Sequence, residues 1–284
     1  RRDGERTSDV MAYSARVLLD SIAPSGIRLT TLEVTFPRFV LSEFNTHRVL
    51  SRNSASSRAI PTSKLLERVM GEPVVPLEWG RNKAGMQADD VISEEEALEA
   101  RRIWLAARDA AVAHARQLLE LKVHKQELNR ILEPFLWHTV IVTATEWENF
   151  FLLRCSPAAQ PEIRKAALLM RDAIESSAPA AVGIGDWHLP LIQDDERSLP
   201  IEQQKMISAA RCARVSYLTH EGRREIGKDI ELHDRLKGER HLSPFEHVAT
   251  PSGDAQFHAN FRGWRQMRSE IEAATWPSLA ARRS

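Results

Sequence analysis

The sequence predicts a protein that combines β-strands with α-helices, and three stretches carry this prediction. Residues 28–36 alternate apolar and polar side chains, as a half-buried strand does. A capping box, Ser93-Glu-Glu-Glu96, opens a stretch with apolar residues at helical spacing, which predicts a helix over 93–122. A proline stands at the first position of another helix, predicted over 161–175. The chain is therefore expected to be of the mixed α/β class.

The first predicted elements lead directly to a site. The polar residues 1–10 are expected to be disordered, and residues 11–284 are expected to form a single domain. Residues 13–23 are apolar with β-branched members, and a Pro-Ser-Gly turn connects them to the strand at 28–36. A helix is expected over 39–48, and its end would deliver the His-Arg pair at 47 and 48 to the site.

Beyond residue 60, the predicted helices and strands alternate with loops. Residues 61–92 hold prolines and glycines with little periodicity, which predicts a long loop. The apolar stripe of the helix at 93–122 is interpreted as core or subunit interface. The other predicted elements are a short helix at 124–134, a strand at 135–145, a helix or tight turn at 147–154, a linker at 179–199, a helix at 200–216 and a short helix at 228–236.

The composition indicates a soluble globular protein. Of 284 residues, 43% are hydrophobic and 27% charged, and the formal net charge is zero, so general attraction to nucleic acid or an anionic membrane is not expected. The two cysteines, Cys155 and Cys212, can form neither a disulfide framework nor a four-cysteine metal site, and they suit a reducing cytoplasm. No apolar run approaches the ~20 residues that a membrane span needs. A cytoplasmic location is therefore expected.

One short stretch concentrates side chains that bind anions. Residues 44–61 contain His47, Arg48, Ser51, Arg52, Asn53, Ser54, Ser56, Ser57 and Arg58. Arginine offers a rigid fork of donors that matches phosphate or carboxylate, and hydroxyl and backbone N–H groups complete an anion cradle. The stretch therefore predicts a site for a phosphorylated, planar ligand. The alternatives are a polar surface loop and a basic patch for nucleic acid.

Histidines in the last third of the chain raise the question of a metal. His233, His241 and His247, taken with Asp229, match no compact zinc motif, so no metal site is predicted. The segment Ser243-Pro-Phe-Glu246 is typical of a capped helix start with proline at the first position. Because the N-terminus of a helix attracts anions, this segment is compatible with a role in ligand binding.

A more specific pattern joins these features. Thr46-His47-Arg48, followed after seven residues by Ser56 and then Arg58, resembles the Arg-His-Arg-x7-Ser signature of the flavin-dependent thymidylate synthases. Asn53 falls where that family has asparagine. Further similarity follows in family order: Asn129-Arg130-Ile-Leu-Glu-Pro134, Thr143, Asn149-Phe-Phe-Leu-Leu-Arg154 and Ala159-Gln-Pro-Glu-Ile-Arg164. Chance is a poor explanation for this series.

Two further motifs stand in an unexpected order. Ala213-Arg-Val-Ser-Tyr217 and His241-Leu-Ser-Pro-Phe-Glu-His247 resemble flavin-contacting motifs that usually precede the Arg-His-Arg signature. Here they follow it, which predicts a circular permutation that places the usual N-terminal portion at 200–250, after the linker. Residues 260–268, with three arginines, have no counterpart in the family. They are interpreted as a replacement for the arginine missing at Thr46, or as a basic surface helix.

The resemblance implies a fold, a reaction and an assembly. The implied fold is a central, mostly antiparallel sheet with flanking helices. The implied reaction is the reductive methylation of dUMP to dTMP, with methylenetetrahydrofolate as carbon donor, FAD as cofactor and NADPH as reductant. The implied assembly is a homotetramer with active sites at subunit interfaces. The alternative is a related C5 methylase or hydroxymethylase that acts on dUMP or dCMP.

The resemblance also implies roles for individual residues. Arg154 is the expected catalytic residue, which holds the uracil and favours loss of its N3 proton. The neighbouring Cys155 is interpreted as a small hydrophobic residue, without a catalytic role. The expected substrate-binding residues are Glu43, Ser54, Ala55, Ser56, Ser57, Arg58, Arg130 and Arg154. The expected cofactor-binding residues are His47, Arg48, Val49, Asn53, Thr143, Asn149, Ser216, Ser243 and Glu246.

Three positions depart from the family pattern. Thr46 replaces an arginine that contacts FAD, which predicts weaker flavin affinity. Glu43 stands where the family usually has glutamine, and Ser54 stands where an acidic residue is common. A carboxylate at position 43 is unfavourable beside a phosphate unless it pairs with Arg48 or Arg268. These departures leave both the nucleotide and the fate of the transferred carbon open.

Overall fold

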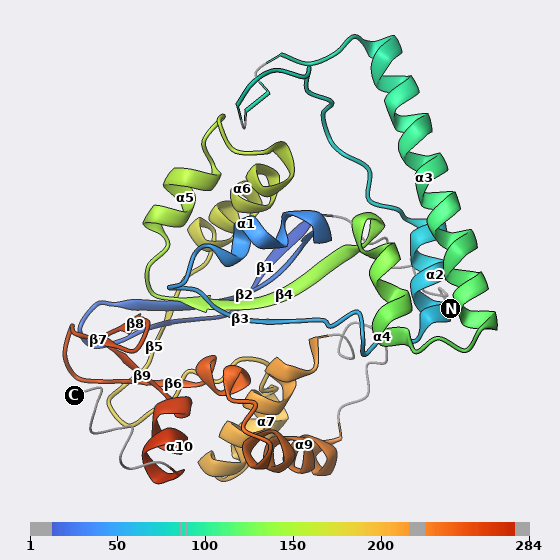
Figure 1. Ribbon diagram of the computed structural model, residues 1–284. Helices are drawn as coiled ribbons and strands as arrows, with labels where there is room; N and C mark the ends of the chain where they lie inside the picture. Colours follow the sequence, from blue (N-terminus) through green and yellow to red (C-terminus); the bar gives the residue numbers. More distant parts are fainter. Residues whose placement is uncertain (1–12, 86, 89, 216–224, 276–284) are drawn as a thin grey trace, which may run out of the picture.

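A five-stranded sheet forms the centre of the computed structural model (Figure 1). The strands lie in the order β3-β4-β2-β1-β5, with bounds β1 Ser14–Ile22, β2 Arg28–Pro37, β3 Ser51–Ser54, β4 Trp137–Ala144 and β5 Ala180–Ala181. Neighbouring strands are antiparallel except β1 and β5, which are parallel. The expected mixed α/β class with a mostly antiparallel sheet is confirmed. The structure describes residues 13–85, 87–88, 90–215 and 225–275, and the prediction for residues 1–10 lies outside them.

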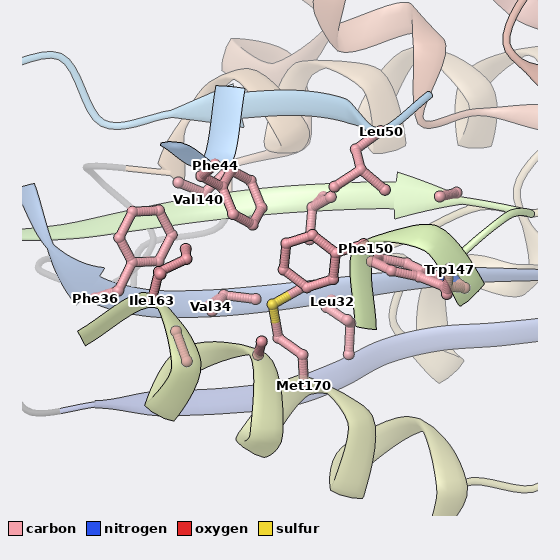
Figure 2. Packing of buried hydrophobic residues seen from close by; sticks show 14 of the residues in the cluster. Leu32, Val34, Phe36, Phe44, Leu50, Val140, Trp147, Phe150, Ile163 and Met170 are labelled. Carbon is pink, nitrogen blue, oxygen red and sulfur yellow. The ribbon is translucent and has the colours of Figure 1, made fainter. Parts of the chain in front are cut away.

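Helices cover one face of this sheet and bury the main core against it. They are α1 (Leu41–Asn45), which follows the 3-10 turn η1 (Arg38–Val40), α5 (Glu148–Arg154) and α6 (Pro161–Glu175). Side chains alternate along a strand, so the even-numbered residues of β2 and β4 point toward these helices. Figure 2 shows the contact between strand and helix residues in this core: Leu32, Val34, Phe36, Val140, Phe150, Ile163 and Met170.

A second apolar cluster lies to one side of the sheet (Figure 1). It joins α2 (Thr62–Gly71), the long helix α3 (Glu94–Glu120), α4 (Lys125–Leu128) and the 3-10 helix η2 (Asn129–Phe135). The capping box of Ser93 and Glu96 at the start of α3 is present as predicted. Helix α3 buries Val112 and Ala115 in its C-terminal half, whereas its first half exposes Leu98 and Ile103.

Helix α2 corrects the sequence analysis, which predicted a loop over the whole of 61–92. Leu65, Leu66 and Val69 lie on its buried face and pack in the second cluster. The prolines and glycines that predicted the loop, at positions 73, 76, 80 and 85, all lie beyond the end of this helix. Pro61 and Gly71 bound it, since proline is well tolerated at the start of a helix and glycine at its end.

The C-terminal part of the chain lies against the opposite face of the sheet (Figure 1). It comprises the helices α7 (Ile201–Ala213), α9 (Ile226–Gly238) and α10 (Met267–Thr275) with the 3-10 helix η4 (Ser243–Glu246). Cys212 and Val215 pack against Ile141 of β4. Two short antiparallel pairs complete this layer, β6 (Ala249–Pro251) with β9 (Trp264–Gln266) and β7 (Phe257–His258) with β8 (Phe261–Arg262).

The segment that precedes α7 is itself part of the packed structure. Residues 179–199, predicted as a linker, contribute β5, the buried His188 and the 3-10 helix η3 (Asp194–Ser198). Glu196 of η3 accepts two hydrogen bonds from Arg211 of α7, at 2.5 and 2.6 Å. Asp229 of α9 accepts a third from the same side chain at 3.0 Å. Because all three are buried, this cluster ties η3, α7 and α9 together.

The segment 257–266 is built from strands, so the alternative of a basic surface helix over 260–268 is wrong. Trp264 and Phe261 are fully buried against Ile27 and its neighbours, and the indole of Trp264 donates to the carbonyl of Ile27 at 3.1 Å. Gly263 lies between them with a φ of 70°. Glycine adopts this left-handed conformation without strain.

Gly263→Ala is predicted to lower the free energy of unfolding by about 1–3 kcal/mol. The new Cβ would lie 2.7 Å from Ile27 Cδ1 and 3.1 Å from the carbonyl oxygen of Asp254. Gly238 of α9 is the matched control because a Cβ there meets nothing within 4 Å. Gly238→Ala should be neutral or stabilising. If denaturant unfolding showed the same loss of stability in Gly263→Ala and Gly238→Ala, this account of the packing around Gly263 would be contradicted.

Candidate functional site

Helices α1 and α5 bring three of the expected functional residues, Glu43, His47 and Arg154, together with Thr46. The Arg154 Nε donates to His47 Nε2 at 2.8 Å, and its Nη2 donates to Thr46 Oγ1 at 3.0 Å and to the Glu43 carbonyl at 3.2 Å. Phe150 fixes this arrangement, since its ring packs edge-on against the ring of His47 with centroids 4.9 Å apart. Polar atoms at the end of α1 and just after it therefore hold the Arg154 guanidinium in place.

The electrostatics of this cluster keep His47 neutral. Burial lowers the pKa of His47, and the positive charges of Arg154 and Arg52 lower it further. A neutral imidazole can accept a hydrogen bond at Nε2, as the contact with Arg154 requires. In the described part of the chain, Arg154 contacts only neutral acceptors and no carboxylate. Its positive charge is consequently available to a ligand.

A pocket of about 740 Å³ opens between β3 and the C-terminal layer. On the β3 side it is lined by Asn45, Arg48, Leu50 and Arg52. On the C-terminal side it is lined by Ser243, Glu246, Ala259, Asn260, Gln266, Arg268, Ser269 and Glu272. Three of the expected cofactor-binding residues, from segments about 200 positions apart in the sequence, thus share one pocket: Arg48, Ser243 and Glu246.

The charged groups of the pocket are unevenly paired. Arg268 donates to Glu246 at 2.5 Å and to Glu272 at 3.0 Å. Arg52 donates to the carbonyl oxygens of Phe44 and His47, at 3.3 and 3.0 Å. Burial lowers the pKa of Arg52, Glu246 raises it and Arg48 lowers it, so the two arginines of the β3 side repel one another. An anion in the pocket would relieve this repulsion.

A chain of buried hydrogen bonds runs behind the pocket and contains two more expected cofactor residues, Asn53 and Thr143. The Asn53 amide lies 3.2 Å from His247 Nε2, and with its nitrogen on this side it also donates to the Arg52 and Ser243 carbonyls, each at 3.1 Å. His247 Nδ1 lies 2.7 Å from Thr143 Oγ1. Thr143 Oγ1 lies 2.7 Å from Thr31 Oγ1, which is 2.8 Å from Nε2 of a second buried histidine.

That second histidine, His188, ends the chain at Ser21, whose Oγ lies 2.7 Å from Nδ1. All the bonds are satisfied when each group donates in one direction, from Asn53 through His247, Thr143 and Thr31 to His188 and on to Ser21. Both imidazoles must then be neutral. Burial enforces this because it lowers the pKa of each histidine to about 3.

The other expected substrate-binding residues lie at the far end of β4. Glu133 of η2 collects two of them, accepting from Ser57 Oγ at 2.7 Å and from Arg130 Nη1 at 2.8 Å. Ser54, at the end of β3, and Arg58 are exposed, whereas Ala55 and Ser56 are half-buried. Helix η2 precedes β4 and α5 follows it, and eight extended residues span on the order of 25 Å. One chain therefore does not bring Arg130 and Arg154 together.

The remaining expected residues are scattered. Val49 is exposed, and its carbonyl accepts from Asn260 at 3.0 Å. Asn149 is exposed in the first turn of α5. Ser216 lies outside the described residues. The predicted side-chain cap of Ser243 is absent, because η4 is a four-residue 3-10 helix that follows Leu242. The Glu43 carboxylate accepts from Ser42 at 2.8 Å and does not pair with Arg268.

Sequence analysis missed part of the pocket wall. Gln266 is buried and donates to Ser51 Oγ at 3.2 Å and to Asn260 Oδ1 at 2.9 Å. Arg52 stands in the anion-binding stretch, but the family resemblance assigned it no role. The concentration of arginines at 260–268 was the available signal, and Arg268 does line the pocket.

The described residues hold neither a candidate membrane span nor a candidate metal site. They include no helix that is both long enough and apolar enough to cross a membrane. They also include no group of three or more histidine, cysteine or acidic side chains that could hold a metal ion.

The sheet with its flanking helices defines a mixed α/β protein, and its pocket is lined by three arginines and two glutamates. Residues 28–180, more than half of the chain, match the family model of the thymidylate synthase complementing protein. The chain therefore belongs to this family, which confirms the resemblance of the motifs that lie within this range. Membership indicates a methyltransferase-type enzyme of nucleotide biosynthesis. None of the curated proteins matches the chain.

Among solved structures, the chain is similar to a UMP/dUMP methylase, PolB, from Streptomyces cacaoi. The complex with 5-Br dUMP has a TM-score of 0.49 at 16% identity, covering 57% of this chain and 90% of that chain. The complex with 5-Br UMP has a TM-score of 0.47 at 16% identity, covering 57% and 88%.

Acid is predicted to destabilise the fold through the buried histidines. The histidine pKa is about 6.5 in an unfolded chain and about 3 for His188 and His247 in the folded protein. As the pH falls from about 6.5 to 3, these two histidines therefore become protonated in the unfolded state but stay neutral in the native state. Each group should lower the free energy of unfolding by up to about 1.4 kcal/mol per pH unit in this window.

His247→Gln tests this prediction, because an amide can still bond to its neighbours but does not titrate. Denaturant unfolding between pH 7 and pH 4 should show a shallower loss of stability in His247→Gln than in the wild type. The control is His114→Gln, at an exposed position of α3, which should keep the wild-type slope. An unchanged slope in His247→Gln would be inconsistent with a neutral buried imidazole.

Proposed function

We propose that the protein converts dUMP to dTMP by reductive methylation, with methylenetetrahydrofolate as carbon donor, FAD as cofactor and NADPH as reductant. Family membership over residues 28–180 supports a reaction of this class. The observation that carries the proposal is the Arg154 guanidinium, which neutral acceptors hold in place and no carboxylate of the described chain neutralises.

Arg154 is proposed to act on the uracil ring. Its contacts with His47, Thr46 and the Glu43 carbonyl use Nε and Nη2, so both N–H groups of Nη1 remain for a ligand. A fixed cation beside N3 and the adjacent carbonyl stabilises the negative charge that develops when N3 loses its proton. That charge raises the electron density at C5, where the new bond forms. The neutral His47 orients the guanidinium without cancelling its charge.

The cysteines support a reaction without thiol attack. Cys212 is fully buried and Cys155 is half-buried, and burial raises the pKa of both thiols. A cysteine nucleophile must be a thiolate, which an electropositive and accessible environment favours. Neither thiol has such an environment. The activation of C5 is therefore assigned to Arg154.

The pocket fits a flavin dinucleotide. Its volume of about 740 Å³ falls within the range of about 300–1,000 Å³ that is usual for ligand sites. Arg48 and Arg52 would hold the pyrophosphate, and Ser243 would add a hydroxyl. Relief of the repulsion between the two arginines adds to the affinity for an anion. When bound, FAD would supply the hydride that reduces the transferred carbon.

The shared pocket supports the proposed permutation. Ser243 and Glu246 belong to the motif that precedes the Arg-His-Arg signature in the usual proteins, and they line the same pocket as Arg48. Asn53 and His247 join the two segments by a hydrogen bond at 3.2 Å. Spatial proximity of this kind is what a permuted chain needs in order to rebuild the same site.

A homotetramer with shared active sites is proposed to complete the substrate site. Arg130 and Arg154 lie at opposite ends of β4, so both can contact one dUMP only if they come from different copies. Exposed apolar side chains are available for such an assembly: Leu152 and Leu153 beside Arg154, and Leu98 and Ile103 on α3. In this arrangement one copy contributes Arg154 and another contributes Arg58 and Arg130.

Glu43 favours a second candidate, C5 methylation or hydroxymethylation of dCMP. Its carbonyl accepts from Arg154, so its half-buried side chain belongs to the same cluster. A carboxylate accepts hydrogen bonds and cannot donate one. It would therefore bind the 4-amino group of cytosine and would be a poor partner for the 4-carbonyl of uracil.

The test is an anaerobic assay of the purified protein with FAD, NADPH, methylenetetrahydrofolate and either dUMP or dCMP, read by product mass. Conversion of dUMP to dTMP is the expected result. Arg154→Ala should lower turnover by about 100-fold or more, since it removes the charge that stabilises the developing anion. Its affinity for FAD should remain unchanged, because Arg154 does not line the pocket.

Arg197→Ala is the matched control, at an exposed arginine whose ion pair with Asp194 lies on the surface, and it should keep full turnover. A hydroxymethylated product would mean that the transferred carbon captures water instead of being reduced. Product formed only from dCMP would establish the second candidate. Wild-type turnover in Arg154→Ala would remove the role assigned to this residue.

A further inference from the structure

The C-terminal segment 259–272 forms one wall of the pocket, although it lies outside the residues that match the family model. Its position is fixed from within the molecule. Trp264 is fully buried and bonds to the Ile27 carbonyl, and Gln266 bridges Ser51 and Asn260. The segment is therefore a built part of the pocket rather than a loose tail.

Arg268 is the cation that this wall presents. It lies in the first turn of α10, where backbone N–H groups favour anions. Contacts with Glu246 and Glu272 orient its guanidinium, which is 32% exposed at the pocket. These contacts use three of the five N–H groups that an arginine carries, so two remain for a ligand within the described structure.

The charges of the pocket lining favour an anionic ligand. Three guanidinium groups, of Arg48, Arg52 and Arg268, face two carboxylates, of Glu246 and Glu272. Position 46 adds no cation, because threonine is uncharged, and its hydroxyl accepts from Arg154 outside the pocket. The cations come from both walls, from β3 and its preceding turn on one side and from α10 on the other. A ligand with two linked phosphates can engage both walls at once.

We propose that Arg268 binds the pyrophosphate of FAD and that segment 259–272 is a ligand-binding element of this chain. This inference rests on the proposed function, which places FAD in the pocket. Glu246 and Glu272 orient the guanidinium, and Asn260 with Gln266 holds the wall against β3. The segment thus supplies a cation that position 46 does not.

The test measures the affinity of the intact protein for FAD by the change in flavin fluorescence, without turnover. Arg268→Gln should weaken binding about 10- to 100-fold, the usual effect of losing a charge-assisted hydrogen bond. Arg268→Lys, which keeps the charge and loses the fork, should fall between this variant and the wild type. The matched control is Arg265→Gln, at an exposed arginine outside the pocket lining, and it should stay within about twofold.

Inorganic pyrophosphate provides a second readout that needs no flavin chemistry. It should compete with FAD in the wild type and compete more weakly in Arg268→Lys. The lysine variant keeps the inference testable if Arg268→Gln fails to fold. Wild-type affinity for FAD in the Arg268 variants would overturn this inference and leave the proposed function intact. Absence of FAD binding by the wild type would overturn both.

Discussion

The chain of hydrogen bonds across the face of the sheet opposite α6 is the constraint on which the site depends. Thr31 and Thr143 are polar residues of the central strands, and His188 and His247 come from the C-terminal part of the chain. All four are buried, so a lost bond would leave a polar group without water or partner, at about 1–3 kcal/mol for each group. The C-terminal layer can therefore dock on the sheet in one register only.

This register explains how a pocket can be assembled from distant segments. His247 holds Asn53 and thereby places η4 beside β3, which brings Ser243 and Glu246 opposite Arg48. Gln266 makes a second link between the C-terminal segment and β3, because it donates to Ser51, one residue before Arg52. On the other face, apolar packing of Phe150 against Phe44 and His47 sets Arg154. Polar contacts thus position the pocket, and apolar packing positions the residues to which Arg154 bonds.

Much of the fold could be predicted because its signals are local. The alternation in β2, the capping box of α3 and the proline of α6 each depend on neighbouring residues. The clustering of Arg154 with His47 followed only from motif resemblance, since it depends on packing between α1 and α5. The role of His188 could not be predicted, because a lone histidine in an expected linker gives no signal of its partners. Helix α2 was missed because the loop predicted from the prolines and glycines that follow it was extended over the whole of 61–92.

A double-mutant cycle between Thr143 and His247 tests this account most directly. Unfolding free energies would be measured for Thr143→Val, His247→Phe and the double variant. Thr143→Val leaves His247 Nδ1 without its partner, His247→Phe leaves Thr143 with Thr31 alone, and the double variant removes both members of the contact at 2.7 Å. A coupling of about 0.5–3 kcal/mol is predicted. Additive effects within about 0.3 kcal/mol would contradict the claim that this hydrogen bond holds the two layers in register.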